Sequence, residues 1–178
     1  MEDSTLNGGS ALDALVAAYS VTGDERIRMY VDAVFDGLVR CASFAEAQGF
    51  VDFELQQIEN EKWKRWILLL KETKEIIGTC LVFYNDDENE NHWDISYNLG
   101  KKYWGKGYTT EAMKAVMKFA ETELGMKECI TTYAKVNNSS ANVLHKLGFQ
   151  DEKDISYECS GGDIITDGIL CRYVATQK

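Results

Sequence analysis

The stretch KKYWGKGYTTEAM, residues 101–113, is the best guide to the fold of this chain. Gly105 and Gly107 stand directly before a run whose apolar residues recur at helical spacing. Glycine loses more backbone freedom on folding than any other residue, so this pair indicates a turn with a special purpose. A strand ending near Leu99, this turn and a helix from Thr109 would make an anion site, because free amides and the helix dipole both favour negative charge. The alternative is an ordinary turn before a capped helix.

The other side chains of this stretch are consistent with a phosphate ligand. Lys101, Lys102 and Lys106 supply positive charge in an acidic chain. Thr109 or Thr110 is placed to cap the helix or to bond a phosphate oxygen. The dinucleotide pattern GxGxxG is incomplete here, and the P-loop pattern is missing. Spacing alone therefore predicts a phosphate-binding turn without identifying the ligand.

Beyond residue 64 the chain alternates between strand and helix patterns. Two apolar runs flank KETKE, residues 71–75, which is typical of an antiparallel hairpin. A strand over 92–99 and a strand over 128–136 are linked by a helix that Gly125 should close, so a parallel right-handed crossover is expected. The last expected elements are a helix over 139–148, capped by Ser139 or Ser140 and ended by Gly148, and a hairpin over 154–173 turning at Gly161 and Gly162.

The first third of the chain has a different character. Residues 1–10 are small, polar and rich in glycine, and we expect them to be flexible. Apolar residues at helical spacing over 11–62, ending with a segment at 51–63, predict a helical region before a core of 63–178. With 178 residues and 45% hydrophobic composition, a single domain over 11–178 is expected.

Charge and hydropathy exclude several classes of protein. The net charge of −10 argues against nucleic-acid binding and favours either a cationic substrate or simple solubility. The longest apolar run, residues 66–70, is far too short to span a membrane, and the N-terminus lacks a signal-peptide pattern. We therefore expect a cytoplasmic protein without membrane contacts.

Cysteines and histidines give no sign of a metal site. The five cysteines are widely spaced and are expected to be reduced and mostly buried: Cys41, Cys80, Cys129, Cys159 and Cys171. His92 and His145 are expected to be structural or surface residues. The sequence thus predicts no metal.

Two longer segments carry a family resemblance. WDISYNLGKKYWGKGYTTEAMKAVMKFA, residues 93–120, is followed by VNNSSANVLHKLGF, residues 136–149. Together they resemble the GCN5-related N-acetyltransferase (GNAT) superfamily, and more closely its RimJ/RimL-like subgroup, over residues 64–175. The resemblance implies an α/β (α+β) fold with a mixed, mostly antiparallel central sheet, flanked by helices and splayed open where acetyl-CoA binds. It also implies direct acetyl transfer to an amine without a covalent enzyme intermediate.

The resemblance assigns cofactor contacts to particular residues. The family motif that binds the pyrophosphate through backbone amides matches Lys102, Gly105 and Gly107, with lysine where the family has arginine or glutamine. The second motif matches Asn137, which in the resembling subgroup contacts the pantetheine arm. The complete set of expected acetyl-CoA contacts is Leu99, Lys102, Gly105, Lys106, Gly107, Tyr108, Thr109 and Asn137.

The resemblance also assigns catalytic roles, with one departure from the family. Many members carry a general-acid tyrosine where this chain has Leu144, which leaves Ser140 as the candidate acid; the alternative for Ser140 is a helix cap. Asp94 stands where the subgroup often has glutamate and is the candidate base, acting through water. Its alternative is an ordinary strand carboxylate or a partner for substrate charge.

The resulting prediction is an acetyl-CoA-dependent N-acetyltransferase. The acceptor is a protein N-terminus or a small amine such as a polyamine, an amino acid or an aminoglycoside. The missing tyrosine, and the absence of the family's usual first strand from residues 1–25, keep a non-catalytic acyl-CoA-binding module open as the alternative. The sequence does not fix the oligomeric state, and a homodimer is one option.

Overall fold

The computed structural model describes residues 53, 56, 57, 60–87, 90–158 and 164–175. The expected flexible N-terminus, most of the expected helical region and the turn at Gly161 and Gly162 lie outside the described residues. The chain divides into two compact units, each of which is described by itself. The first includes residues 66–79 and 98–102, and the second includes 61–65, 80–97 and the chain from 103 onward.

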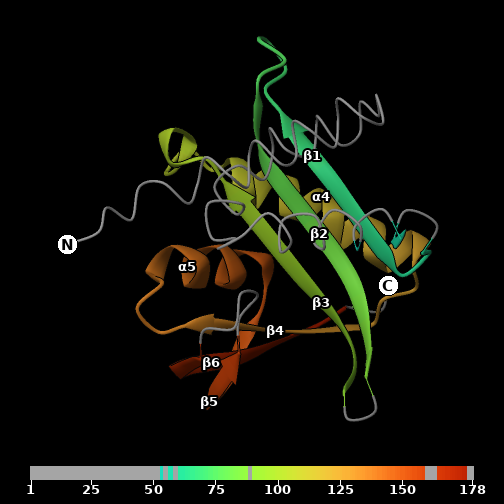
Figure 1. Ribbon diagram of the computed structural model, residues 1–178, viewed down its shortest axis with the longest axis vertical. Coiled ribbons are helices and arrows are strands. Elements are labelled where there is room, and N and C mark those ends of the chain that lie inside the picture. Colours follow the sequence, from blue (N-terminus) through green and yellow to red (C-terminus); the bar gives the residue numbers. More distant parts are fainter. Residues whose placement is uncertain (1–52, 54–55, 58–59, 88–89, 159–163, 176–178) are drawn as a thin grey trace, which may run out of the picture. The chain divides into compact units, whose positions relative to one another are not determined.

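Strands and helices follow one another in the order expected of a mixed α/β chain (Figure 1). Their bounds are β1 Trp63–Leu69, β2 Ile76–Asp87, β3 Glu90–Leu99, the 3-10 turn η2 Lys101–Tyr103, α4 Tyr108–Glu123, β4 Glu128–Ala134, α5 Asn138–Leu147, β5 Gln150–Glu158 and β6 Ile164–Val174. The strands form one six-stranded sheet in the order β1-β2-β3-β4-β6-β5. This mostly antiparallel sheet with flanking helices confirms the predicted fold class.

The crossover through α4 is parallel, as the sequence predicted. β3 pairs with β4 in parallel, with Trp93 opposite Cys129, whereas β6 pairs antiparallel with both β4 and β5. Figure 1 shows β3 and β4 running at a clear angle to each other. The two strands therefore diverge beyond their paired residues, which gives the splay that the family resemblance implied.

The core of the second unit lies between the sheet and its helices. α4 buries Met113, Val116, Met117 and Ala120 on one face, as its apolar spacing requires. β4 alternates strictly, with every second residue from Cys129 buried, so one face of the strand meets the core. No helix in the described part of the chain is long and apolar enough to cross a membrane.

The buried cysteines behave as small hydrophobic residues. Cys80, Cys129 and Cys171 are free thiols with no measurable exposure. Burial raises the pKa of Cys80 and Cys171 to about 12 and that of Cys129 well above its ordinary value, because a thiolate is poorly solvated there. The prediction of reduced, buried cysteines is confirmed for these three, while Cys41 and Cys159 lie outside the described residues.

Several expected element ends are wrong. The chain is helical at Phe53 and Gln56, but Trp63, placed in that helix by the sequence, begins β1. WKRW carries two tryptophans and its residues are all half-buried, and aromatic residues favour a strand. The predicted strand over 128–136 ends at Ala134, and its last two residues form the turn before α5.

Candidate active site

The glycine turn leads directly into the N-terminus of α4. Gly105 and Gly107 adopt φ values of +73° and +83°, in the left-handed region that other residues rarely enter. A Cβ atom at either position would meet nothing within 4 Å. Backbone torsion, not crowding, is therefore what requires glycine here, and the space beside both residues is open.

The start of α4 corrects one expectation. Gly107 is the N-cap and α4 begins at Tyr108, so neither Thr109 nor Thr110 caps the helix. Gly107 has no side chain, so the N-cap residue itself gives the first amides no side-chain hydrogen bond. In an α-helix the first amides have no partner within the helix, and the dipole favours negative charge near them. The turn therefore has backbone features that an anion site requires, while the anion site itself stays a prediction.

Each unit contains some of the residues that the sequence assigned to cofactor binding, and each is described within its own unit. In the second unit, the Lys106 ammonium lies 5.8 Å from the centroid of the Tyr103 ring. In the first unit, Leu99 ends β3, and Lys102 forms an exposed ion pair with Glu75 at 2.5 Å. The Lys102 charge is thus partly offset by a carboxylate, a partner that the sequence motif does not reveal.

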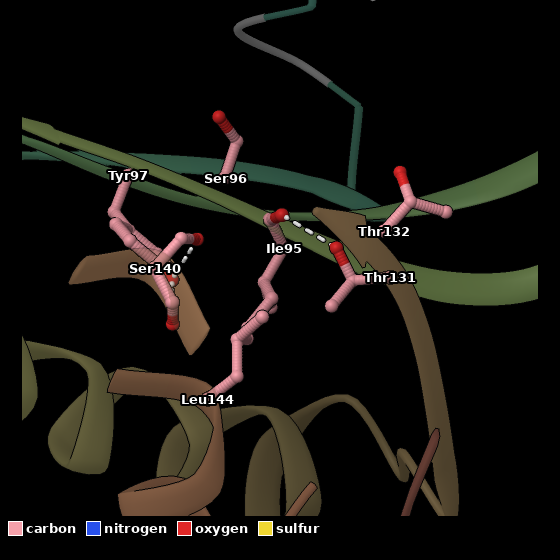
Figure 2. Close-up of a pocket in the computed structure, with 7 residues that line it drawn as sticks. All are labelled: Ile95, Ser96, Tyr97, Thr131, Thr132, Ser140 and Leu144. Carbon is pink, nitrogen blue, oxygen red and sulfur yellow. Dashed lines mark hydrogen bonds between the residues drawn. The ribbon is translucent and has the colours of Figure 1, made fainter. Parts of the chain in front are cut away.

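A cavity of about 130 Å³ lies within the second unit, where β3 and β4 diverge. Its lining residues are Ile95, Ser96, Tyr97, Thr131, Thr132, Ser140 and Leu144. Figure 2 shows Ser96 and Thr132 directed to one side of the strands, and Tyr97 to the other side, where Ser140 and Leu144 of α5 lie. The cavity is thus bordered by hydroxyl groups on both sides of the sheet, and its volume suits a small group such as an acetyl thioester.

Tyr97 and Ser140 meet on the helix side of this cavity. The Tyr97 hydroxyl lies 2.8 Å from Ser140 Oγ and donates to the Ser140 carbonyl oxygen at 3.3 Å. Burial raises the pKa of Tyr97 to about 12, because the phenolate would lose its solvation. Tyr97 therefore keeps its proton at neutral pH and can donate it.

The helix that carries Ser140 is capped by a different residue from the one expected. Asn137 is the N-cap of α5, and its carboxamide oxygen accepts the Ser140 amide at 3.1 Å. The expectation that Ser139 or Ser140 caps this helix is wrong, because the asparagine three residues earlier reaches the same amide. The Ser140 hydroxyl instead faces Tyr97.

The candidate base is less directly placed. Asp94 lies on β3, and its carboxylate accepts the Ile95 amide at 2.6 Å. It does not line the cavity, but strand alternation places it on the same side as Ser96. Ser140 thus lines the cavity, whereas Asp94 precedes the lining residue Ile95 on β3 and does not line the cavity itself.

Sequence reasoning missed most of the cavity lining. Ser96, Tyr97, Thr131 and Thr132 were not selected, although the first two lie inside the motif-bearing segment. Alternation along the strand would have indicated that Ile95 and Tyr97 share a side. No local pattern indicated that Tyr97 meets a serine 43 positions further along the chain.

The fold resembles that of solved amine acetyltransferases. The spermidine N-acetyltransferase SpeG from Vibrio cholerae, in an F149A mutant form, superposes with a TM-score of 0.59 at 15% identity, covering 75% of this chain and 76% of that one. At this identity the similarity shows the fold alone. It defines the class: an α/β protein with the acetyltransferase architecture.

Sequence comparison identifies the family. The model of the acetyltransferase (GNAT) domain matches residues 10–150, so the chain belongs to the GNAT acetyltransferases, a family of N-acetyltransferases. The uncharacterized N-acetyltransferase p20 of Bacillus licheniformis is 34% identical over 102 residues, which is 57% of each chain. The ribosomal protein uS5-alanine N-acetyltransferase of Escherichia coli is 31% identical over 80 residues, or 44% of this chain and 41% of that protein. The matches to these two relatives thus span about half of their length.

Proposed function

We propose that this chain transfers the acetyl group of acetyl-CoA directly to a primary amine. The observation that carries the proposal is the cavity between β3 and β4, which is bordered by hydroxyl groups and has room for a thioester. Direct attack requires a neutral amine, stabilisation of the developing oxyanion and a proton for the leaving thiolate. The hydroxyl groups around this cavity are suited to the last two requirements.

The glycine turn supports acetyl-CoA as the acetyl donor. The open space beside Gly105 and Gly107, and a helix start whose N-cap is a glycine, fit a pyrophosphate held by main-chain amides. Tyr108 and Thr109 supply two of these amides, and Lys106 supplies positive charge nearby. We assign the pantetheine arm to the neighbourhood of Asn137, at the start of α5.

We assign the reacting groups to opposite sides of the sheet. Ser140 stands on the helix side, where it is the candidate donor to the thiolate. Asp94 stands on the side of Ser96, where it would take the amine proton through water or hold a positively charged acceptor. The role of Asp94 in holding a positively charged acceptor agrees with the net charge of −10, which favours cationic ligands.

Two acceptor classes remain candidates. The Escherichia coli relative is named for acetylating a ribosomal-protein alanine, and SpeG is named for acetylating spermidine. The first relative supports a RimJ/RimL-like subgroup and a protein N-terminus as the acceptor. The second supports a small polyamine as the acceptor. A cytoplasmic location is part of the same proposal, and a homodimer stays an open option.

A panel assay tests the function. Purified protein is given acetyl-CoA with spermidine, single amino acids, an aminoglycoside or an N-terminal alanine peptide, and free thiol and product mass are measured. Thiol release that depends on one amine, with a product heavier by one acetyl group, would support the proposal. Tight CoA binding by calorimetry without acetylation of any amine would favour the non-catalytic binding module instead.

A further inference from the structure

The hydroxyl pair at Tyr97 and Ser140 joins two elements across the cavity. Tyr97 lies near the end of β3 and Ser140 in the first turn of α5, and both line the cavity. Their oxygens lie 2.8 Å apart, which is an ordinary length for a hydrogen bond between hydroxyl groups. This contact connects a half-buried phenol to a serine that lines the cavity.

The direction of this hydrogen bond can change without moving either residue. When Tyr97 donates to the Ser140 carbonyl at 3.3 Å, the serine proton points back to the phenol oxygen. When Tyr97 donates to Ser140 Oγ, the serine proton is released toward the cavity. Rotation of the two hydroxyl groups thus changes the direction of the hydrogen bond between them, so that the serine proton points into the cavity.

The other residues on this side are poorly suited to supply a proton. Leu144 occupies the position where many family members carry a tyrosine, and it is 1% exposed. The Thr131 hydroxyl already donates to the Ile95 carbonyl at 3.5 Å. Among the described lining residues on the helix side, the Tyr97–Ser140 pair is therefore the best-placed source of a proton.

We propose that Tyr97 supplies the proton taken by the leaving thiolate of CoA, and that Ser140 relays it. The inference rests on the proposed acetyl transfer. As the amine nitrogen bonds to the acetyl carbon and the carbon–sulfur bond breaks, sulfur takes the Ser140 proton and Ser140 Oγ takes the Tyr97 proton. The ammonium that forms gives one proton to water, and the Tyr97 phenolate regains one from water. The products are the amide and neutral CoA thiol.

The acidity of Tyr97 is compatible with such a transfer. Burial raises the pKa of Tyr97 to about 12, because the phenolate would lose its solvation. The phenol therefore keeps its proton at neutral pH and is available to donate it. The transfer itself rests on the 2.8 Å contact between the two hydroxyl oxygens.

The test removes only the phenol oxygen. Tyr97→Phe should lower kcat by about 100-fold, within the range usual for loss of a general acid, with CoA affinity measured by calorimetry changed less than about threefold. Tyr133→Phe is the matched control, since Tyr133 is buried, has a pKa raised to about 12 and donates to Asp151 outside the cavity. This control should keep the wild-type kcat. The double variant Tyr97→Phe with Ser140→Ala should be no slower than the slower single variant, because both belong to one relay.

A second readout separates proton donation from a structural role. A fluorinated tyrosine at position 97 has a more acidic phenol, so the alkaline fall of kcat should move to lower pH together with the absorbance change of the phenolate. Wild-type kcat in Tyr97→Phe, or a pH profile that does not follow the phenol, would overturn the relay while leaving acetyl transfer intact. A wild-type protein that acetylates no amine would overturn both proposals.

Discussion

One prediction about the glycine turn compares alanine substitutions at the two ends of α4. Gly107 precedes the helix and Gly125 follows it, with φ values of +83° and +69°. An added Cβ would meet nothing within 4 Å at either position. Alanine in the left-handed region costs about 1–2 kcal/mol, so Gly107→Ala and Gly125→Ala should lower the free energy of unfolding by similar amounts.

The two variants should differ in binding CoA. A methyl group at Gly107 occupies the open space that a phosphate would enter, and losing one main-chain hydrogen bond to a charged group costs about 1.5–3 kcal/mol. We therefore expect the Kd for CoA, measured by calorimetry, to rise about 10- to 100-fold in Gly107→Ala. In Gly125→Ala it should change less than about twofold. Equal affinities in two equally destabilised variants would refute the assignment of this turn to the pyrophosphate.

Further predictions concern stability and are measured by urea unfolding. The pKa of Cys80 is about 12 in the folded protein, against 9.0 for an ordinary thiol. The stability that this shift contributes is therefore complete below pH 9 and is lost as the pH rises toward 12. Through Cys80 alone, the free energy of unfolding should fall by about 1.4 kcal/mol between pH 8 and pH 10. The fall should be smaller in Cys80→Ala than in the wild type. Equal falls in the two proteins would contradict this origin. Asn137→Ala should cost about 1 kcal/mol through loss of the helix cap, whereas Asn137→Asp should retain it, and equal losses would argue against the cap. Gly168→Ala places a Cβ 2.6 Å from the Tyr157 ring and should cost about 1–3 kcal/mol, with part of the loss absent when Tyr157 is already alanine. Fully additive losses would contradict that clash.

The fold class and the glycine turn were predictable because their causes are local. Gly105, Gly107 and Gly148 adopt positive φ values, which a short stretch of sequence indicates through glycine itself. The face of α4 and the alternation of β4 follow from periods that lie within one element. The residues and spacing of the two motifs were then sufficient to suggest the family that the comparisons confirm.

Helix caps were predicted less well, for a physical reason. Thr109, Thr110, Ser139 and Ser140 are all good capping residues, and a neighbouring glycine or asparagine occupies the cap position instead. Capping depends on the backbone torsion of the residue before the first turn, which a list of preferred residue types does not specify. The roles assigned to Asp94 and Ser140 stay predictions, and the double variant with Ser140→Ala addresses that of Ser140.

What the sequence determined by itself is the backbone of the site: a left-handed turn at Gly105 and Gly107, and a helix that begins after it. Torsion preference and periodicity act over a few residues, so they can be read in any short window. The tertiary structure decided which side chains meet. Tyr97 faces Ser140 because a parallel crossover and the packing of α5 bring together groups 43 positions apart, a distance over which no local pattern acts.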